Sequence, residues 1–516
     1  MIRRFLLSLA YLALSASGLV AEVARSEGAT NILFVTMDDM NWDSIGVYGC
    51  PIPEISPNID RLAREGMRFE YAFNQTSSCV PSRTTYQTGR YPHVNGVLSF
   101  YNVDFNLETL PEILRRMGYT TGVVNKPRDT SISEEYSKYW DYHRIMNGPD
   151  KRGAITYEDS LNAFFDLVES KGNPFYCVVN IADPHKPFFN DEASKKRGFD
   201  LYAPSIEYSL DDVEVPPFLV EHPSIREEMR NYYNSVKRGD DCVGVVLETL
   251  AARGHEEDTL VIFVSDHGMP LPFAKSSLYT NGTRTPWIAR WPGKVERGRL
   301  ESDLMVSAID FMPTILDVVG AGVFDHLPGN SLLPALLGQS QRGPEFVFTE
   351  FNDIAGGHPF PMRAVYTKTH AYIFNAWANG ERRFQSASTT HTSEKTLREL
   401  AKKGGTAAER YEFLVNRCLE EFYDYRADPH ASRNLIDHRD HAEEIERLRS
   451  ALASWMRETD DYALEAFEKR GSREQLIDWM DKIDAEALAR AETLQWKRHS
   501  NRAGETGENT LLYRLH

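Results

Sequence analysis

Four short runs of strand-favouring residues, each ending in polar side chains, restrict the fold of this chain more than any other feature. They are Asn31 to Thr36, Thr121 to Val124, Phe175 to Ile181 and Leu260 to Ser265. The runs are continuously apolar rather than alternating, which is typical of strands buried on both faces of a sheet. Helical patterns lie between them, at Asn58 to Glu65, Leu110 to Met117, Ser160 to Glu169 and Met229 to Ala252. This repetition predicts an α/β fold with a mainly parallel central sheet flanked by helices.

The sequence pattern changes after Leu337. Shorter strands are predicted at Phe346 to Phe351, Arg363 to Thr367, Ala371 to Phe374 and Phe422 to Tyr425, and an amphipathic helix at Glu443 to Arg457. The polar residues 381–410 are interpreted as a solvated insertion. We therefore expect an N-terminal domain over residues 30–340, a smaller C-terminal α+β subdomain over 341–460, and a charged extension over 461–516.

The first 21 residues are typical of a secretory signal. Arg3 and Arg4 give a positive start, Phe5 to Leu14 is apolar, and small residues follow. The apolar stretch is shorter than the ~20 residues of a membrane span, so a cleaved signal peptide over residues 1–21 is favoured over an uncleaved anchor. We expect an exported protein, in a periplasmic, secreted or lysosome-like location. The five cysteines are an odd number, so at least one stays unpaired, and the other four form two disulfides or none.

The overall charge excludes two classes of partner. The chain has 58 Lys and Arg residues against 75 Asp and Glu residues, a net charge of −17. A nucleic-acid binder needs a basic face to displace counterions, and an anionic membrane repels an acidic surface. We therefore expect neither nucleic acid nor membrane as a partner. A small anion stays compatible with this charge, because a local basic pocket can exist on an acidic protein.

The polar residues that end the apolar runs are candidates for a shared site. Asp38-Asp39, Lys126, His185 and Asp266-His267 each follow one of the predicted strands. The carboxyl ends of parallel strands meet at one edge of a sheet, where ligands bind. Adjacent carboxylates repel each other unless a cation or proton lies between them, which favours a hard divalent ion such as Ca²⁺. A solvated loop or a helix cap is the alternative for such an aspartate pair.

The most specific motif runs from Cys79-Val80-Pro81-Ser82-Arg83 to Thr88-Gly89. Pro81 suits the first turn of a helix, whose amide groups favour an anion. A lone cysteine in this setting is more often buried and inert. The whole run, however, matches the pattern C-x-P-S-R-x4-T-G and resembles the type I formylglycine-dependent sulfatases of the alkaline phosphatase superfamily. The resemblance implies the sulfatase fold and the conversion of Cys79 to formylglycine by a maturation enzyme.

The resemblance also implies roles for the strand-end residues. The metal ligands would be Asp38, Asp39, Asp266, His267 and an oxygen of the converted Cys79. His267 stands where the family often has Asn, and its softer nitrogen leaves Mg²⁺ as an alternative to Ca²⁺. His185 or Lys275 would protonate the leaving atom, while Lys126, Arg83 and the metal would neutralise the charge of the sulfate.

One departure from the family pattern concerns substrate binding. The family has K-x-H where this chain has Lys126-Pro127-Arg128, and arginine cannot accept a proton. A base acting there would have to be another residue, such as Asp129, and Arg128 would instead bind the substrate's anion. His93 and Arg363 are the other predicted substrate contacts, the first by its resemblance to a family position and the second near the rim of the pocket.

Several later motifs resemble the heparan sulfamidase branch of the family. They include Ser265 to Pro272 with Lys275, and Leu278-Tyr279. The expected function is therefore hydrolysis of sulfate esters or sulfamates of sulfated sugars, such as N-sulfoglucosamine in glycosaminoglycan degradation. Two alternatives stay open. One is a phosphonate or phosphodiester hydrolase of the same superfamily. The other is a non-catalytic glycan-binding protein in which Cys79 is never converted.

Overall fold

The computed structural model describes residues 30–100, 107–131, 133, 135–322, 324, 326–355 and 357–493. The expected signal peptide and the last part of the expected C-terminal extension lie outside these residues. No described helix is long and apolar enough to cross a membrane. All five cysteines lie in the described part of the chain, and none forms a disulfide.

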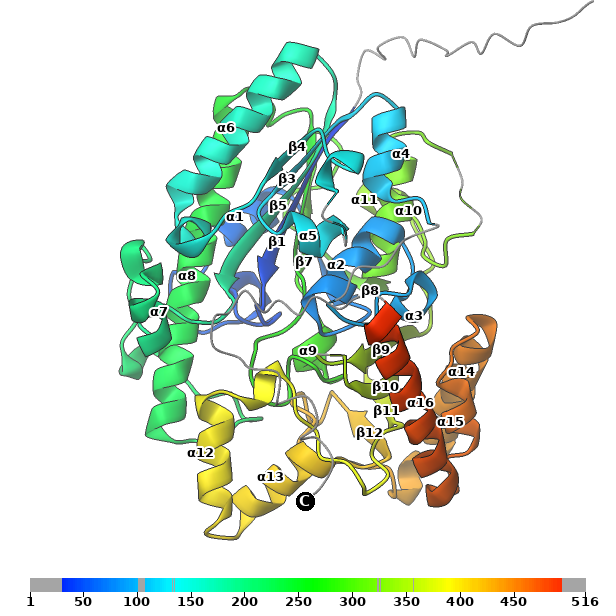
Figure 1. The fold of residues 1–516 in the computed structure, drawn as a ribbon. Coiled ribbons are helices and arrows are strands. Elements are labelled where there is room, and N and C mark those ends of the chain that lie inside the picture. The colour runs from blue at the N-terminus through cyan, green and yellow to red at the C-terminus, as the bar shows by residue number, and fades with distance from the viewer. Residues whose placement is uncertain are drawn as a thin grey trace, which may run out of the picture.

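The central element is an eight-stranded sheet with the order β4-β3-β5-β1-β6-β7-β2-β8 (Figure 1). Only β7 runs antiparallel to its neighbours β6 and β2, and the other pairs are parallel. The predicted mainly parallel sheet is thus confirmed. Its strands are β1 Asn31–Asp38, β2 Met67–Phe73, β3 Thr120–Val124, β4 Tyr142–Arg144, β5 Phe175–Pro184, β6 Thr259–Ser265, β7 Trp287–Arg290 and β8 Arg299–Ser307.

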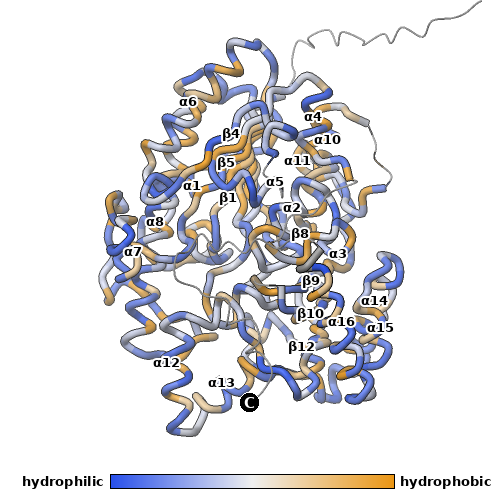
Figure 2. Tube along the Cα trace, in the orientation of Figure 1, coloured by the Kyte–Doolittle hydropathy of each residue, from blue (hydrophilic) through white to orange (hydrophobic). Residues whose placement is uncertain are grey.

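Helices cover both faces of this sheet. Successive side chains of a strand point to opposite faces, so Leu33 and Val35 of β1 pack in one hydrophobic cluster and Ile32 and Phe34 in another. This explains why the strand sequences are continuously apolar (Figure 2). The helices on the Leu33 face are α1 Pro57–Glu65, α6 Ala154–Lys171 and α8 Pro223–Ala252. Those on the Ile32 face are α2 Cys79–Thr88, α4 Leu110–Arg116, α10 Phe311–Val318 and α11 Leu333–Leu336.

A second, smaller sheet lies in the C-terminal part of the chain. Its order is β12-β11-β10-β9, and every pair is antiparallel. Its strands are β9 Val347–Asp353, β10 Pro359–Tyr366, β11 His370–Asn375 and β12 Glu420–Asp424. The helices that follow are α14 Ala442–Glu458, α15 Leu464–Glu468 and α16 Arg473–Thr493. One hydrophobic cluster extends over both sheets, so the division at residue 340 stays a prediction.

The expectation of a solvated insertion at residues 381–410 is wrong for much of that segment. It contains α12 (Thr392–Ala401), which lies beside the lower end of α8 in Figure 1, and the first residues of α13 (Thr406–Asn416). Ser393 and Leu397 are buried, and the hydroxyl of Ser224 lies 2.9 Å from that of Thr396. This polar segment packs against α8 partly through hydrogen bonds. A hydrophobicity pattern does not reveal contacts of this kind. The remaining short helices are α3 Pro92–Asn95, α5 Pro127–Ser131, α7 Glu192–Lys196 and α9 Thr280–Thr283.

A buried ionic network joins the two parts of the chain. Arg363 of β10 has a relative exposure of 0%. Its guanidinium pairs with both carboxylate oxygens of Asp461, at 2.5 and 2.7 Å, and lies 3.5 Å from Glu350 of β9. Glu350 also accepts a hydrogen bond from Nδ1 of His93, which belongs to α3 on the other side of the contact. Arg363 is thus the cation that compensates two buried carboxylates.

We expect Arg363→Ala to lower the free energy of unfolding by about 3–5 kcal/mol, because two buried carboxylates would lose their cation. Urea denaturation followed by circular dichroism would measure the loss. Arg426→Ala is the matched control, because Arg426 pairs with Asp424 at the surface, where such pairs contribute about 0–1 kcal/mol. A loss below about 1 kcal/mol for Arg363→Ala would contradict a structural role for this network.

Candidate active site

The carboxyl ends of four adjacent strands carry the polar side chains predicted from the sequence. Asp38 ends β1 and is followed by Asp39, whose φ of 67° lies in the left-handed region. This turn directs the amide of Asp39 to the Asp266 carboxylate, at 3.0 Å. Lys126 follows β3 and His185 follows β5, while Asp266 follows β6. Because β3, β5, β1 and β6 are consecutive in the sheet, these residues share one edge.

Cys79 is the first residue of α2, and every residue of this helix is buried. The hydroxyl of Ser82 donates to the Asp266 carbonyl at 2.5 Å, which fixes the start of α2 against the end of β6. The Sγ atom of Cys79 lies 3.2 Å from Nε2 of His267 and 3.4 Å from Nζ of Lys275. Burial raises the pKa of the Cys79 thiol. The predicted nucleophile therefore faces the strand-end cluster.

The donor atoms of this cluster suit a divalent cation. Ligand atoms of Asp38, Cys79, Asp266 and His267 all lie within 4.8 Å of one another, and those of Asp38, Asp39, Cys79 and His185 form a second such group. Oδ2 of Asp39 is buried without a hydrogen bond from any described residue, while the buried Oδ2 atoms of Asp38 and Asp266 are contacted by the cationic groups of Lys126 and Arg83. A hard ion with oxygen ligands would satisfy Asp39 and bind the remaining lone pairs of the other two carboxylates.

The orientation of His267 supports the same conclusion. A carbonyl can only accept, so Nδ1 of His267 donates to the Gly268 carbonyl at 2.9 Å. The lone pair of Nε2 then faces Asp39 Oδ1 at 3.1 Å. Two electron-rich atoms facing each other fit a cation between them, and a carbonyl on the far nitrogen is the usual way to orient a histidine ligand.

Three cations lie beside the three aspartates, of which Arg83 and Lys275 are buried and Lys126 is half-buried. Arg83 pairs with Asp266 at 2.9 Å, Lys275 pairs with Asp39 at 2.7 Å, and Lys126 contacts Asp38. Burial acts to raise the pKa of Asp38, but Lys126 and other nearby cations outweigh it and hold that pKa well below its ordinary range. Burial likewise works against Lys126 and Lys275, yet their aspartate partners raise the pKa of both. The protein part of the cluster is therefore close to neutral.

His185 lies at the outer side of the cluster. Its side chain is 39% exposed, and Nε2 lies 3.9 Å from Asp39 Oδ2. Nδ1 donates to the Lys186 carbonyl at 2.6 Å, which leaves Nε2 directed toward the cluster. Burial of the ring lowers the pKa of His185 to about 4. The imidazole is thus placed between solvent and the buried aspartates.

The predicted substrate contacts lie in two different places. Arg128 is half-exposed on α5, two residues beyond Lys126, and Asp129 lies 3.4 Å from the Lys126 ammonium group. His93 and Arg363 belong instead to the buried network around Glu350. We assign these two residues to positioning the C-terminal part of the chain, because their polar atoms face Glu350 and Asp461 rather than the strand ends.

Sequence reasoning missed two residues that contribute to the site. Asn180 of β5 accepts from Arg83 at 2.5 Å and from Thr36 at 2.8 Å, and so holds the arginine behind Cys79. The signal was an asparagine inside an otherwise apolar strand. His391, at the start of α12, interacts electrostatically with Lys275, Asp39 and His185. No local sequence pattern indicates His391, because only the packing of α12 against α8 brings this residue close to the site.

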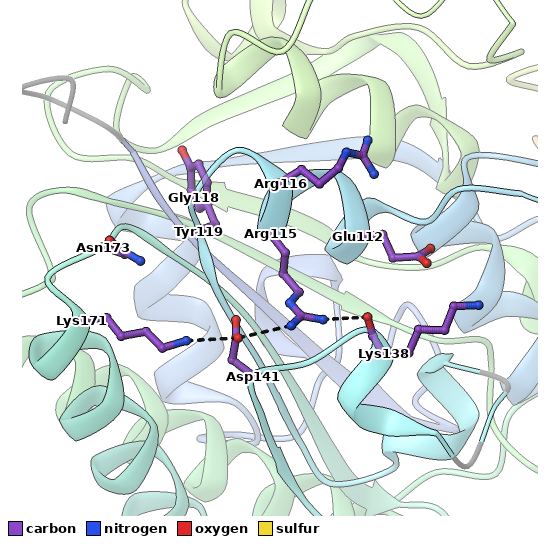
Figure 3. A pocket seen from close by; sticks show the side chains of 9 residues that line it. All are labelled: Glu112, Arg115, Arg116, Gly118, Tyr119, Lys138, Asp141, Lys171 and Asn173. Carbon is purple, nitrogen blue, oxygen red and sulfur yellow. Dashed lines mark hydrogen bonds and ion pairs between the residues drawn. The ribbon is translucent and has the colours of Figure 1, made fainter. Parts of the chain in front are cut away.

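A cavity on another part of the molecule is not the site. It measures about 500 Å³ and lies at the amino ends of β3 and β5, opposite the edge that carries Asp38 (Figure 3). Its cations Arg115 and Lys171 already pair with Asp141, at 3.6 and 3.1 Å. The candidate catalytic and metal-binding side chains lie instead at the opposite edge of the sheet, with Asp38.

Comparisons with known proteins show which family this chain resembles. A family model described as sulfatase matches residues 30–321. Human N-sulphoglucosamine sulphohydrolase is 30% identical over 474 residues, covering 84% of this chain and 90% of the relative. An ulvan-active sulfatase of Formosa agariphila is 24% identical over 437 residues, covering 84% of this chain and 80% of the relative.

Solved structures extend the likeness to the fold. One, of a protein in complex with its substrate D-glucosamine-2-N,6-O-disulfate, superposes with a TM-score of 0.61 at 19% identity and covers 84% of this chain and 99% of that one. The family model alone covers more than half of the chain, and it includes the cysteine helix and all the strand-end aspartates. The chain therefore belongs to the sulfatase family.

Proposed function

We propose that this protein hydrolyses sulfate esters or sulfamates of sulfated saccharides, with Cys79 converted to formylglycine as the nucleophilic residue. The observation that carries the proposal is the position of Cys79. It begins a buried helix and faces Asp38, His267 and Lys275 within 3.6 Å. The names of the relatives, a sulphohydrolase and sulfatases, support the same reaction class.

We propose that Asp38, Asp39, Asp266 and His267 hold Ca²⁺, or Mg²⁺, together with an oxygen of the converted residue. The three aspartates are already balanced by Arg83, Lys126 and Lys275. A divalent ion would therefore leave the pocket with a net positive charge, which a sulfate group would neutralise. The ion would supply charge stabilisation for the sulfate oxygens.

The hydrated aldehyde would supply one hydroxyl for attack on sulfur and a second to expel the sulfate afterwards. Lys275, at 3.4 Å from the Cys79 side chain, is placed to orient this group and to bind a sulfate oxygen. Lys126 stays cationic beside Asp38 and would bind another oxygen. Arg83 lies behind the cluster and holds Asp266, so its contribution is positioning.

The leaving atom requires a proton donor on the open side of the site. His185 is the half-exposed member of the cluster, and its Nε2 points toward it. We propose that Lys275, which stays cationic beside Asp39, or His185 protonates the leaving oxygen or nitrogen. Because its Nδ1 donates to the Lys186 carbonyl and its pKa is lowered, His185 would donate from Nε2 only after its ring takes up a second proton beside the bound sulfate. Arg128, on the same side as Lys126, is proposed to contact an anionic part of the substrate.

Two further aspects of the proposal concern maturation and location. Every residue of α2 is buried, so a maturation enzyme would have to act on Cys79 before the chain folds. We propose such an enzyme as a partner, and export directed by the signal at residues 1–21. The two alternatives, a phosphonate or phosphodiester hydrolase and a non-catalytic glycan binder, differ from the proposal in measurable ways.

We expect a peptide containing Cys79, taken from protein made in its native host, to have lost its sulfur and gained an aldehyde by mass spectrometry. Cys79→Ala and Cys79→Ser should each lower sulfate release by about 10³-fold or more, because alanine has no nucleophile and the single hydroxyl of serine can attack but cannot expel the sulfate. An intact thiol would favour the glycan-binding alternative, and multiple turnovers by Cys79→Ser would refute the two-hydroxyl mechanism.

We expect Ca²⁺ to raise the melting temperature of protein freed of metal by chelation. At a concentration about 100-fold above the dissociation constant, binding should stabilise the fold by ~2.7 kcal/mol. Asp39→Asn should reduce this shift, whereas Asp211→Asn, at an exposed position, should keep it. Identical melting curves with and without Ca²⁺ or Mg²⁺ would argue against the metal centre.

We expect sulfate release from N-sulfoglucosamine, or from a terminal sulfated sugar, to exceed release from internal positions of long chains. Ion chromatography of sulfate from N-sulfated, 6-O-sulfated and 2-O-sulfated saccharides would measure it. Activity restricted to the O-sulfated set would exclude a sulfamidase and leave a sulfatase. Faster hydrolysis of matched phosphate or phosphonate esters would instead support the phosphoester alternative.

A further inference from the structure

The start of α12 is held beside the active site by Glu228 of α8. One oxygen of this carboxylate accepts from the Thr392 amide at 3.3 Å, and the other accepts from the Ser393 amide at 2.8 Å. Glu228 also pairs with Lys186, the neighbour of His185. The hydroxyl contact between Ser224 and Thr396 fixes the same helix one turn later. A segment about 200 residues away in sequence is thus fastened to the residue next to the predicted proton donor.

His391 is the residue that precedes these two amides, as the N-cap of α12. It is half-buried, and its ring makes no hydrogen bond to any described residue. Its electrostatic neighbours are Lys186, Lys275, Asp39 and His185, which all belong to the active site or adjoin it. An imidazole placed there without a partner has both a donor and an acceptor to offer to a ligand.

The surroundings of His391 indicate which kind of group it would bind. Burial, with the ammonium groups of Lys186 and Lys275, lowers the pKa of His391 to about 2, so the ring is neutral. The amides of Thr392 and Ser393 and the ammonium group of Lys186 are already bound by Glu228. These two amides and this ammonium group are therefore not left for a second anion. A neutral ring suits a hydroxyl or amino group, which both donates and accepts.

We propose that His391 is a specificity-determining residue, which hydrogen-bonds a hydroxyl or amino group of the sugar whose sulfate lies at Cys79. This inference rests on the proposed function and deepens it. The strand ends would bind the sulfate, whereas α12 would bind the sugar ring from the opposite side. A substrate without a sugar would make only the first set of contacts.

The test compares two substrates on the matured enzyme, N-sulfoglucosamine and 4-nitrophenyl sulfate. We expect His391→Ala to lower kcat/KM for the saccharide by about 10-fold, mainly through KM, because one hydrogen bond to the sugar is lost. The loss on the aryl sulfate should be smaller by at least about 5-fold, because this substrate has no ring hydroxyl to bind. His391→Gln, which keeps a donor and an acceptor, should recover part of the saccharide activity.

His438→Ala is the matched control, because His438 is an exposed histidine outside the site. Equal losses on both substrates, or no loss on the saccharide for either His391 variant, would overturn the inference. Wild-type protein that hydrolyses neither substrate would instead refute the proposed function. Activity on the aryl sulfate alone would overturn both the saccharide specificity and the role of His391.

Discussion

Three aspartates are buried within a few ångströms of one another, and their mutual repulsion is offset by three neighbouring cations, two of them buried and one half-buried. Asp38, Asp39 and Asp266 each have a basic partner that the fold delivers from a different element. Burial alone would protonate such carboxylates, and at Asp38 and Asp39 the cations prevent it by lowering the pKa. Asp38 and Asp39 are therefore kept charged, whereas burial raises the pKa of Asp266. The fold brings the three aspartates and their three basic partners together from the strand ends, from helix α2 and from the loop that carries Lys275.

The parallel sheet does most of that assembly. Strands β3, β5, β1 and β6 are neighbours, so residues that follow them are adjacent although they are far apart in sequence. The start of α2 is then locked to the end of β6 by Ser82, which places Cys79 over the carboxylates. Positions on rigid strand ends are better defined than positions on long loops. A site built in this way keeps its geometry even though its bare charges repel one another.

The C-terminal part of the chain borders the site without supplying the proposed nucleophile or the proposed metal ligands. The network of His93, Glu350, Arg363 and Asp461 fastens the small sheet to the N-terminal part. Contacts from Glu228 then hold α12 against the open side of the pocket. The charged residues in these contacts connect parts of the protein to each other. The polar composition of residues 381–410 therefore does not mean that the segment is exposed to solvent. The same contacts present His391 to the proposed sugar-binding side.

Local sequence was enough to predict the sheet, the cysteine helix and the residues at the strand ends. These features depend on short patterns: a buried strand is apolar along its length, and parallel strands end at the same edge. The positions of Arg363, His93 and His391 could not be predicted, since each depends on a partner about 100 to 260 residues away that no periodicity reveals. Long-range pairing of polar groups is decided by how whole layers pack. The residue types that form the site could therefore be identified from the sequence. Which polar residues surround the site was decided only by the tertiary structure, because packing brings together segments that are distant in sequence.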